Sequence, residues 1–250
     1  MDRQTAALIS FEGIECSGKG TQIDLIASWL TKSKIRCVRE HEPGGGAYGE
    51  ALRAILKNPE LALPAIFEAV RNHSDYEAVK KIKTYGSMNY ERKGLFEVFL
   101  FMASRCLYVD QVYDLTRQGI VVLSDRLMDS TTAYQGGGWA HGDSKMVGDI
   151  NLLNRIAMNG IWPDLTLFLD IPIEEMYQRM AKVHHEKNSF FEKKYDRNFY
   201  DRVRQQYLKI AEQEPERFKI IDGTKPIKTV FAEAKEHIKK VLDAKKTISN

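Results

Sequence analysis

The sequence predicts an α/β fold in which a doubly wound, five-stranded parallel sheet is flanked by helices. Two observations support this class: short apolar segments recur along the chain, and segments with apolar residues at three- and four-residue spacing separate them. Strands that are apolar on both faces are typical of parallel sheets covered by helices. Alternation of such strands with helices over most of the chain favours a doubly wound sheet.

Five segments are predicted as strands. The first, residues 6–11, is apolar almost throughout, whereas the second, residues 35–39, shows a weaker pattern. The other strands are expected over residues 120–124, 165–170 and 218–222. Helices are predicted between the strands, over residues 23–30, 95–115, 146–158, 174–180, 199–211 and 230–242.

The composition is that of an ordinary globular chain. Its 250 residues are 43% hydrophobic and 28% charged, with a net charge of +3. These values exclude a largely disordered chain and do not favour a dedicated nucleic-acid binder. No apolar run approaches the ~20 residues that span a bilayer. Three scattered cysteines and a polar N-terminus without a signal-peptide pattern predict a cytoplasmic protein with reduced thiols.

A glycine-rich segment follows the first predicted strand and precedes a helix. It reads GxxxxGK from Gly13 to Lys19, and in this context the pattern predicts a phosphate-binding loop. Backbone N–H groups and the positive N-terminal end of the helix would bind phosphates, and Lys19 would reach the outer ones. The predicted ATP-binding residues are Gly13, Ile14, Glu15, Cys16, Ser17, Gly18, Lys19, Gly20 and Thr21.

The residue after the lysine departs from the usual loop pattern. A Ser or Thr normally stands there as a Mg²⁺ ligand, but this chain has Gly20, with Thr21 one position later. The segment GKGTQ resembles adenylate kinase-like enzymes, which hold the metal largely through water and a distal carboxylate. The loop therefore favours a kinase of small nucleotides over a GTPase or a motor ATPase.

Polar clusters also follow the second and third predicted strands. Glu42 and Pro43 follow the second strand, with Arg53 on the next helix, and Asp125 and Arg126 follow the third. Ligands of a doubly wound sheet bind at the carboxyl ends of its strands. We therefore expect these clusters and the phosphate loop to converge on one cleft.

Taken together, the motifs resemble those of the thymidylate kinase (dTMP kinase) family, above all its bacterial form. The matching segments read FEGIECSGKGTQ, EPGGG, FMASR, VLSDRLMDSTTAYQGGG, PDLTLFLDIP, FFE and RVRQQYLKIA. They extend from residue 8 to about residue 238, apart from one insertion. The resemblance implies Mg²⁺-dependent phosphoryl transfer from ATP to dTMP, and a homodimer packed through the long helix.

The resemblance also implies roles for residues of the acceptor site. Arg53 and Arg126 would bind the acceptor monophosphate, because a guanidinium matches phosphate geometry. Phe101 would stack on thymine, and Arg105, four residues later on the same helical face, would hydrogen-bond the base edge. Tyr134 would lie against the deoxyribose. The other substrate-binding candidates are Glu42, Pro43, Thr131 and Gln135.

The expected catalytic residues are Lys19, Asp125, Arg126 and Glu15. Lys19 and Mg²⁺ would neutralise charge during in-line transfer, and Asp125 would hold the water shell of the metal. Glu15 resembles the family's acidic residue near the acceptor sugar. Phe99 is expected in the core. Structural explanations remain open for four other residues or pairs: Phe101 as a core residue, Arg105 as a surface ion pair, Tyr134 as a packing aromatic, and Asp125 with Arg126 as an ion pair at the end of a strand.

Within one predicted domain of residues 1–250, residues 182–198 occupy the place of the family's lid, a segment that closes over the phosphates. The phosphate loop contains no arginine, so a lid-side cation is expected to act in its place. The lid candidates are Arg179, Lys182 and Arg197. Residues 189–192, SFFE, predict a capping box that starts the next helix.

A second unusual segment, residues 58–93, is an insertion relative to the family pattern. Short helices are expected over residues 64–72 and 74–84, packed on the edge of the domain near the acceptor side. Contact with substrate, with a partner subunit or only with solvent remains open.

Other functions also remain open on the sequence alone. The acceptor base could be that of dUMP or a 5-modified dUMP. A regulatory or nucleic-acid-dependent P-loop ATPase would hydrolyse ATP without an acceptor, but it leaves Arg53 and Phe101 unexplained. A non-catalytic relative is a further alternative, because the lid is poor in arginine. The long helix is apolar on more than one face in its first half, which predicts a subunit interface.

Overall fold

The computed structural model describes residues 6–57, 90–183 and 195–249. Five parallel strands form one sheet in the order β2-β3-β1-β4-β5, which confirms the predicted doubly wound α/β class. The strands are β1 (Leu8–Glu12), β2 (Cys37–His41), β3 (Val121–Asp125), β4 (Leu165–Asp170) and β5 (Phe218–Asp222).

The first three strands lie one or two residues further along the chain than predicted. Each continues its ladder to a polar residue, since Glu12 pairs with Phe168 and His41 pairs with Asp125. Apolar periodicity ends before these residues, although Glu12 is completely buried. Strands β4 and β5 have the predicted bounds.

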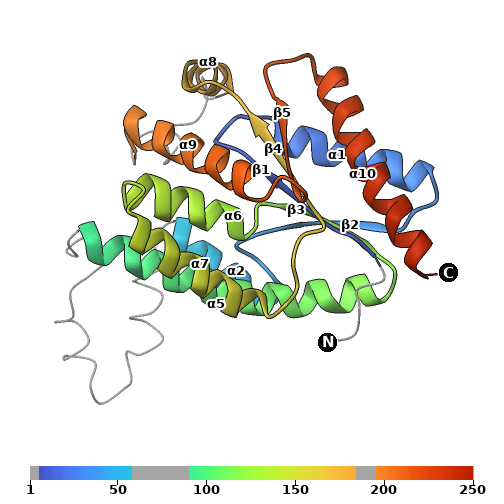
Figure 1. Ribbon diagram of the computed structural model, residues 1–250, viewed down its shortest axis with the longest axis horizontal. Helices are drawn as coiled ribbons and strands as arrows, with labels where there is room; N and C mark the ends of the chain where they lie inside the picture. The colour runs from blue at the N-terminus through green and yellow to red at the C-terminus, as the bar shows by residue number, and fades with distance from the viewer. Residues whose placement is uncertain (1–5, 58–89, 184–194, 250) are drawn as a thin grey trace.

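Helices cover both faces of the sheet, as Figure 1 shows. On one face lie α1 (Lys19–Lys32) and α10 (Ile227–Ser249). The other face carries the long α5 (Tyr90–Arg117), α7 (Ser144–Met158) and α9 (Arg197–Gln213). Helix α2 (Gly46–Lys57) packs against α5, and α8 (Ile173–Val183) follows β4. In the described part of the chain, no helix is both long and apolar enough to cross a membrane.

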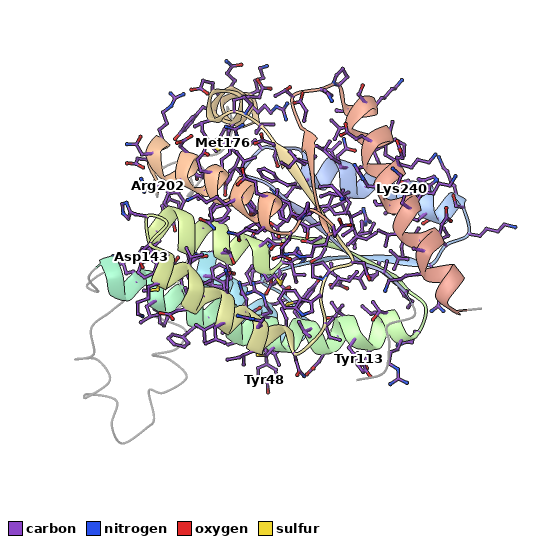
Figure 2. All side chains as sticks on the ribbon, in the orientation of Figure 1. Tyr48, Tyr113, Asp143, Met176, Arg202 and Lys240 are labelled. Carbon is purple, nitrogen blue, oxygen red and sulfur yellow. The ribbon has the colours of Figure 1, made fainter. Side chains whose placement is uncertain are left out.

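The core lies in two layers because successive strand residues point to opposite faces. Ile9 and Phe11 of β1 belong to the layer under α1 and α10. Leu8 of β1 and Val122 of β3 belong to the layer under α5, with Tyr108. Figure 2 shows side chains filling the space between the sheet and both helix layers. Burial on both faces explains why the strands are continuously apolar.

The order of the strands places one crevice at the centre of the sheet. The connection that leaves β1 runs to β2 at one edge of the sheet, and the connection that leaves β3 runs to β4 toward the opposite edge. The two connections therefore diverge from the adjacent strands β1 and β3. Phe11 of β1 is paired with Asp125 of β3. The carboxyl ends of these two strands are therefore adjacent, at the switch point where doubly wound sheets bind ligands.

A short helix and a π-helix that the sequence patterns did not predict follow β3. They are α6 (Met128–Thr131) and η2 (Thr132–Trp139). Glycines allow η2 to approach α9: a Cβ on Gly137 would lie 2.5 Å from Cβ of Gln206, and one on Gly138 would lie 2.5 Å from the Phe199 ring. The glycine run therefore serves helix packing rather than a loop, and π-helical segments are frequent at functional sites.

Several expectations are corrected or lie outside the described residues. Phe99 is 54% exposed on α5, so its assignment to the core was wrong. Most of the insertion, residues 58–89, and the capping box of residues 189–192 lie outside the described residues. Helix α9 begins at Arg197 with Asp196 as its N-cap, whose side chain accepts a hydrogen bond from Phe199 N.

Candidate active site

The phosphate loop connects β1 to α1 at the central crevice. Gly13 has a φ of 147°, and a Cβ there would lie 2.8 Å from the carbonyl oxygen of Leu169. Gly18 has a φ of 97° and forms the N-cap of α1. Cys16, which is not a glycine, also has a positive φ of 56°. These left-handed residues curl the loop around the N-terminus of α1, where a phosphate would meet backbone N–H groups.

Lys19 is buried and turns back onto the loop that precedes it. Its Nζ donates to the carbonyl oxygens of Gly13 and Ile14, at 3.0 and 3.1 Å. Burial lowers the pKa of Lys19 to about 8, and the charge of Arg126 acts in the same direction. The nearby carboxylates, Asp125 foremost, oppose this shift. The loop thus holds a desolvated cation close to the expected phosphates.

A cavity of about 340 Å³ opens beside the loop. Phe101 and Arg105 of α5, at helical spacing of four, reach it together, as predicted. All nine predicted substrate-binding residues line it: Glu42, Pro43, Arg53, Phe101, Arg105, Arg126, Thr131, Tyr134 and Gln135. Glu15 of the phosphate loop and Asp125 line the same cavity. The clusters after the three strands therefore converge as expected, while their roles remain predictions.

Arg105 is buried at the base of the cavity, with a side chain that is 1% exposed. Its Nε lies 2.7 Å from Oε1 of Glu42, and Nη2 donates to Oε2 of Glu42 at 2.8 Å. Nη2 also donates to Oγ1 of Thr131 at 2.9 Å, and Nη1 donates to Asn154. Burial raises the pKa of Glu42, and the charge of Arg105 opposes this shift. This geometry excludes the surface ion pair as an explanation of Arg105.

Arg126 projects from a strained backbone, with a φ of 72°. Its Nη1 donates to Oγ of Ser130 at 3.1 Å and to Oη of Tyr207 at 3.4 Å. Nη2 donates to Oη of Tyr134 at 3.0 Å, and Tyr134 in turn donates to Glu15 at 2.9 Å. Hydroxyl groups therefore hold most of the guanidinium, and a guanidinium held in this way can still bind a phosphate.

Arg53 approaches the cavity from α2. Its Nη1 donates to the carbonyl oxygen of Pro43 at 2.7 Å, and its side chain lines the same cavity as Arg126. Two guanidinium groups from different elements thus border one space. This arrangement suits an anionic ligand such as a monophosphate.

Asp125 offers a carboxylate where Mg²⁺ is expected. Its Oδ1 is buried and has no hydrogen-bond partner among the described residues. The part of the chain that the structure describes contains no group of three or more His, Cys, Asp or Glu side chains that could hold a metal. One free carboxylate oxygen beside a phosphate loop fits Mg²⁺, which usually binds one or two carboxylates, waters and substrate phosphates.

The three lid candidates lie in different surroundings. Arg179 of α8 donates to the carbonyl oxygens of Cys16 at 3.3 Å and Gly223 at 2.8 Å. Arg197 pairs with Glu174 and is 56% exposed, and Lys182 is exposed. Of these three, Arg179 therefore contacts the phosphate loop.

Sequence reasoning missed several residues of this site. Glu12 and Glu97 had a usable signal: Glu12 ends a strand, and Glu97 lies four residues before Phe101 on the same helical face. Glu97 is buried, lines the cavity and accepts from Gln135 at 3.3 Å. Asn154 and Tyr207 lie within helical patterns that carry no comparable signal.

Comparisons with known proteins identify the family of this chain. The family model described as thymidylate kinase matches residues 11–70 and 68–234. A thymidylate kinase from Desulfovibrio desulfuricans is 34% identical over 239 residues, with 94% of this chain and 95% of the relative covered. One from Kosmotoga olearia is 32% identical over 229 residues, with 89% and 90% covered.

The fold of this chain also resembles that of a solved thymidylate kinase. The crystal structure of thymidylate kinase from Ehrlichia chaffeensis has a TM-score of 0.62 and 25% sequence identity, with 94% of this chain and 98% of that chain covered. Sequence motifs, sheet topology and the converging cavity thus agree with the family match, which spans most of the chain. This chain belongs to the thymidylate kinase family.

Proposed function

We propose that this chain transfers the γ-phosphoryl group of ATP to dTMP, giving ADP and dTDP. The observation that carries the proposal is the position of the acceptor cavity beside the phosphate loop, with Asp125 and Arg126 lining it. Phosphoryl transfer depends on positioning and electrostatic stabilisation, and a site that holds donor and acceptor side by side supplies both. Small nucleotides are the proposed partners, without nucleic acid or membrane, and the cytoplasm is the proposed compartment.

On the acceptor side, Arg53 and Arg126 would bind the monophosphate, and Phe101 would stack on the base. The buried pair of Arg105 and Glu42 supports a role in base recognition, because the carboxylate fixes the guanidinium at the cavity wall. Nη1 of Arg105 also makes a weak contact of 3.8 Å with the sulfur of Met102. Because sulfur is a weak acceptor, a carbonyl oxygen of the base would accept a stronger hydrogen bond from this Nη1 group.

On the donor side, the loop N–H groups and Lys19 would bind the ATP phosphates, with Arg179 as the proposed lid-side cation. Mg²⁺, held with the help of Asp125, would neutralise phosphate charge when bound. The Tyr134 hydroxyl accepts from Arg126 and donates to Glu15, and this position supports a role for Tyr134 beside the sugar.

We also propose a homodimer formed through α5. Leu95, Phe99 and Leu107 are 39%, 54% and 40% exposed, and their spacing of four and eight residues places them on one side of the helix. Tyr48 of the adjacent α2 is 79% exposed, and Figure 2 shows it at the rim of the molecule near α5. Light scattering on the wild type and on Phe99→Asp tests this: dimer and monomer, respectively, are expected, and a monomeric wild type contradicts it.

Steady-state kinetics across nucleoside monophosphates test the reaction. We expect dTMP to give the highest kcat/KM, with dUMP and 5-modified dUMP as the informative competitors. Turnover of another monophosphate without turnover of dTMP would contradict the acceptor assignment. ATP hydrolysis that needs no acceptor would instead support the regulatory ATPase.

A further inference from the structure

Glu12, the last residue of β1, is a buried carboxylate with four hydrogen-bond donors around it. Its Oε1 accepts from the backbone N of Leu127 at 2.7 Å and from Oγ of Ser10 at 3.2 Å. Its Oε2 accepts from Oγ of Ser130 at 2.6 Å and from Oη of Tyr207 at 2.8 Å. Above its raised pKa of about 7 the Glu12 carboxylate is ionised and accepts all four bonds, because it then offers about four lone-pair sites and no proton.

Two of these donors also touch Arg126. Oγ of Ser130 and Oη of Tyr207 lie 2.9 Å from each other, and both accept from Nη1 of Arg126. A hydroxyl has one proton to donate. When Ser130 and Tyr207 give their protons to Glu12, both oxygens turn their lone pairs toward the guanidinium.

The backbone of Arg126 is also held by Glu12. The bond from Leu127 N is made by the residue directly after Arg126, whose φ of 72° is unusual for a side chain of this size. A strained residue persists only where its surroundings fix it. The two oxygens of Glu12 thus fix the peptide that follows Arg126 and the tip of the Arg126 side chain.

We propose that Glu12 is a positioning residue for Arg126: through Leu127, Ser130 and Tyr207 it orients the guanidinium toward the acceptor phosphate without touching substrate. The inference rests on the proposed function, because Arg126 is there assigned to that phosphate. Glu12 is not among the residues that line the cavity, so its effect on substrate passes through Arg126.

Asp129 provides a matched control for a purely structural role. Like Glu12 it is a buried carboxylate, 3% exposed. It binds Arg217 through two contacts of 2.8 Å and accepts from Thr166. Glu12→Gln and Asp129→Asn should both lower the melting temperature, because each breaks a buried polar network. Only Glu12→Gln should change recognition of the phosphate.

The test compares two ligands that differ by the phosphate alone. Calorimetry at a pH well above 7, where Glu12 is ionised with or without the charge of Asp129, measures the binding of dTMP and of thymidine to the full chain. The ratio of the two affinities isolates the contribution of the phosphate. Glu12→Gln should lower this ratio about tenfold, the size expected for a weakened hydrogen bond to a charged group. Asp129→Asn should leave the ratio within about twofold of the wild type.

Two further variants establish the route through Arg126. Tyr207→Phe removes one hydroxyl of the relay and should lower the ratio by itself, which keeps the proposal testable if Glu12→Gln does not fold. In an Arg126→Lys background, Glu12→Gln should change the ratio by no more than about twofold, because coupled residues are not additive.

An unchanged ratio in Glu12→Gln and Tyr207→Phe, or an equal fall in Asp129→Asn, would overturn the positioning role. The proposed function fails differently: a wild type that binds neither dTMP nor thymidine, or that binds dTMP without phosphorylating it, contradicts the kinase assignment whatever the variants do.

Discussion

Replacing Glu42 by glutamine removes the charge that balances Arg105 in the interior. Both side chains are almost fully buried, at 2% and 1% exposure. Removing one partner of a buried ion pair costs about 3–5 kcal/mol, because the other charge is left uncompensated. Glutamine keeps the shape and one acceptor oxygen, so we expect the lower end, about 3 kcal/mol. For a chain of 250 residues, this lowers the melting temperature by about 6 °C.

Thermal unfolding of the nucleotide-free protein, followed by circular dichroism, measures this effect. Asp24→Asn is the control, since it breaks an exposed pair with Arg39 and should shift the melting temperature by about 1 °C or less. The double variant Glu42→Gln/Arg105→Met should melt above Glu42→Gln, because no unpaired charge remains. If Glu42→Gln shifts the melting temperature no more than Asp24→Asn, the assigned buried ion pair does not hold.

Four other outcomes are expected. Lys19→Ala should lower kcat about 100-fold or more in the steady-state assay, because it removes charge stabilisation in the transition state; a smaller effect on kcat than on KM for ATP would argue against this role. Phe101→Ala should raise the acceptor KM about tenfold through lost stacking, and an unchanged KM would remove the stacking role. Gly138→Ala should lower the melting temperature by placing a Cβ 2.5 Å from the Phe199 ring, whereas Gly148→Ala, with open space around it, should raise it; equal shifts would contradict the packing argument. Burial and then Asp129 raise the pKa of Glu12 to about 7 from 4.5, while Arg126, Ser130 and Tyr207 oppose this shift. The stability that Glu12 contributes is therefore complete below pH 4.5 and is lost as the pH rises through 7. The stability advantage of wild type over Glu12→Gln should shrink across that interval, and a constant difference would contradict the assignment.

Apolar periodicity was sufficient to predict the sheet, and the glycine-rich loop was recognisable because its spacing and its place between strand and helix are both required for phosphate binding. Convergence of the acceptor residues followed from parallel topology, which brings Asp125 beside the end of β1. Glu12 was missed although it directly follows the apolar residues of β1, because a carboxylate at that place resembles the polar end of a strand rather than a buried group. The same pattern cannot show that Ser130 and Tyr207, far apart in sequence, supply its partners.

Tertiary packing also determined features of the structure that the local sequence pattern could not predict. Three consecutive glycines usually indicate a loop, yet Gly137 and Gly138 lie in a π-helix because α9 leaves no room for side chains. Phe99 was expected inside because it is aromatic and close to Phe101, but it lies on the outer side of α5.

When a phosphate binds Lys19, its new hydrogen bonds replace bonds that the ammonium group already makes to the loop. The three ammonium protons of Lys19 meet the carbonyl oxygens of Gly13 and Ile14 and, at 3.5 Å, Oγ of Ser17, so a ligand must displace at least the weakest of these acceptors. A multiply charged phosphate makes stronger charge-assisted bonds than these neutral acceptors and can displace them. A weakly basic monovalent anion has little advantage over them, so the loop favours a ligand of high charge density.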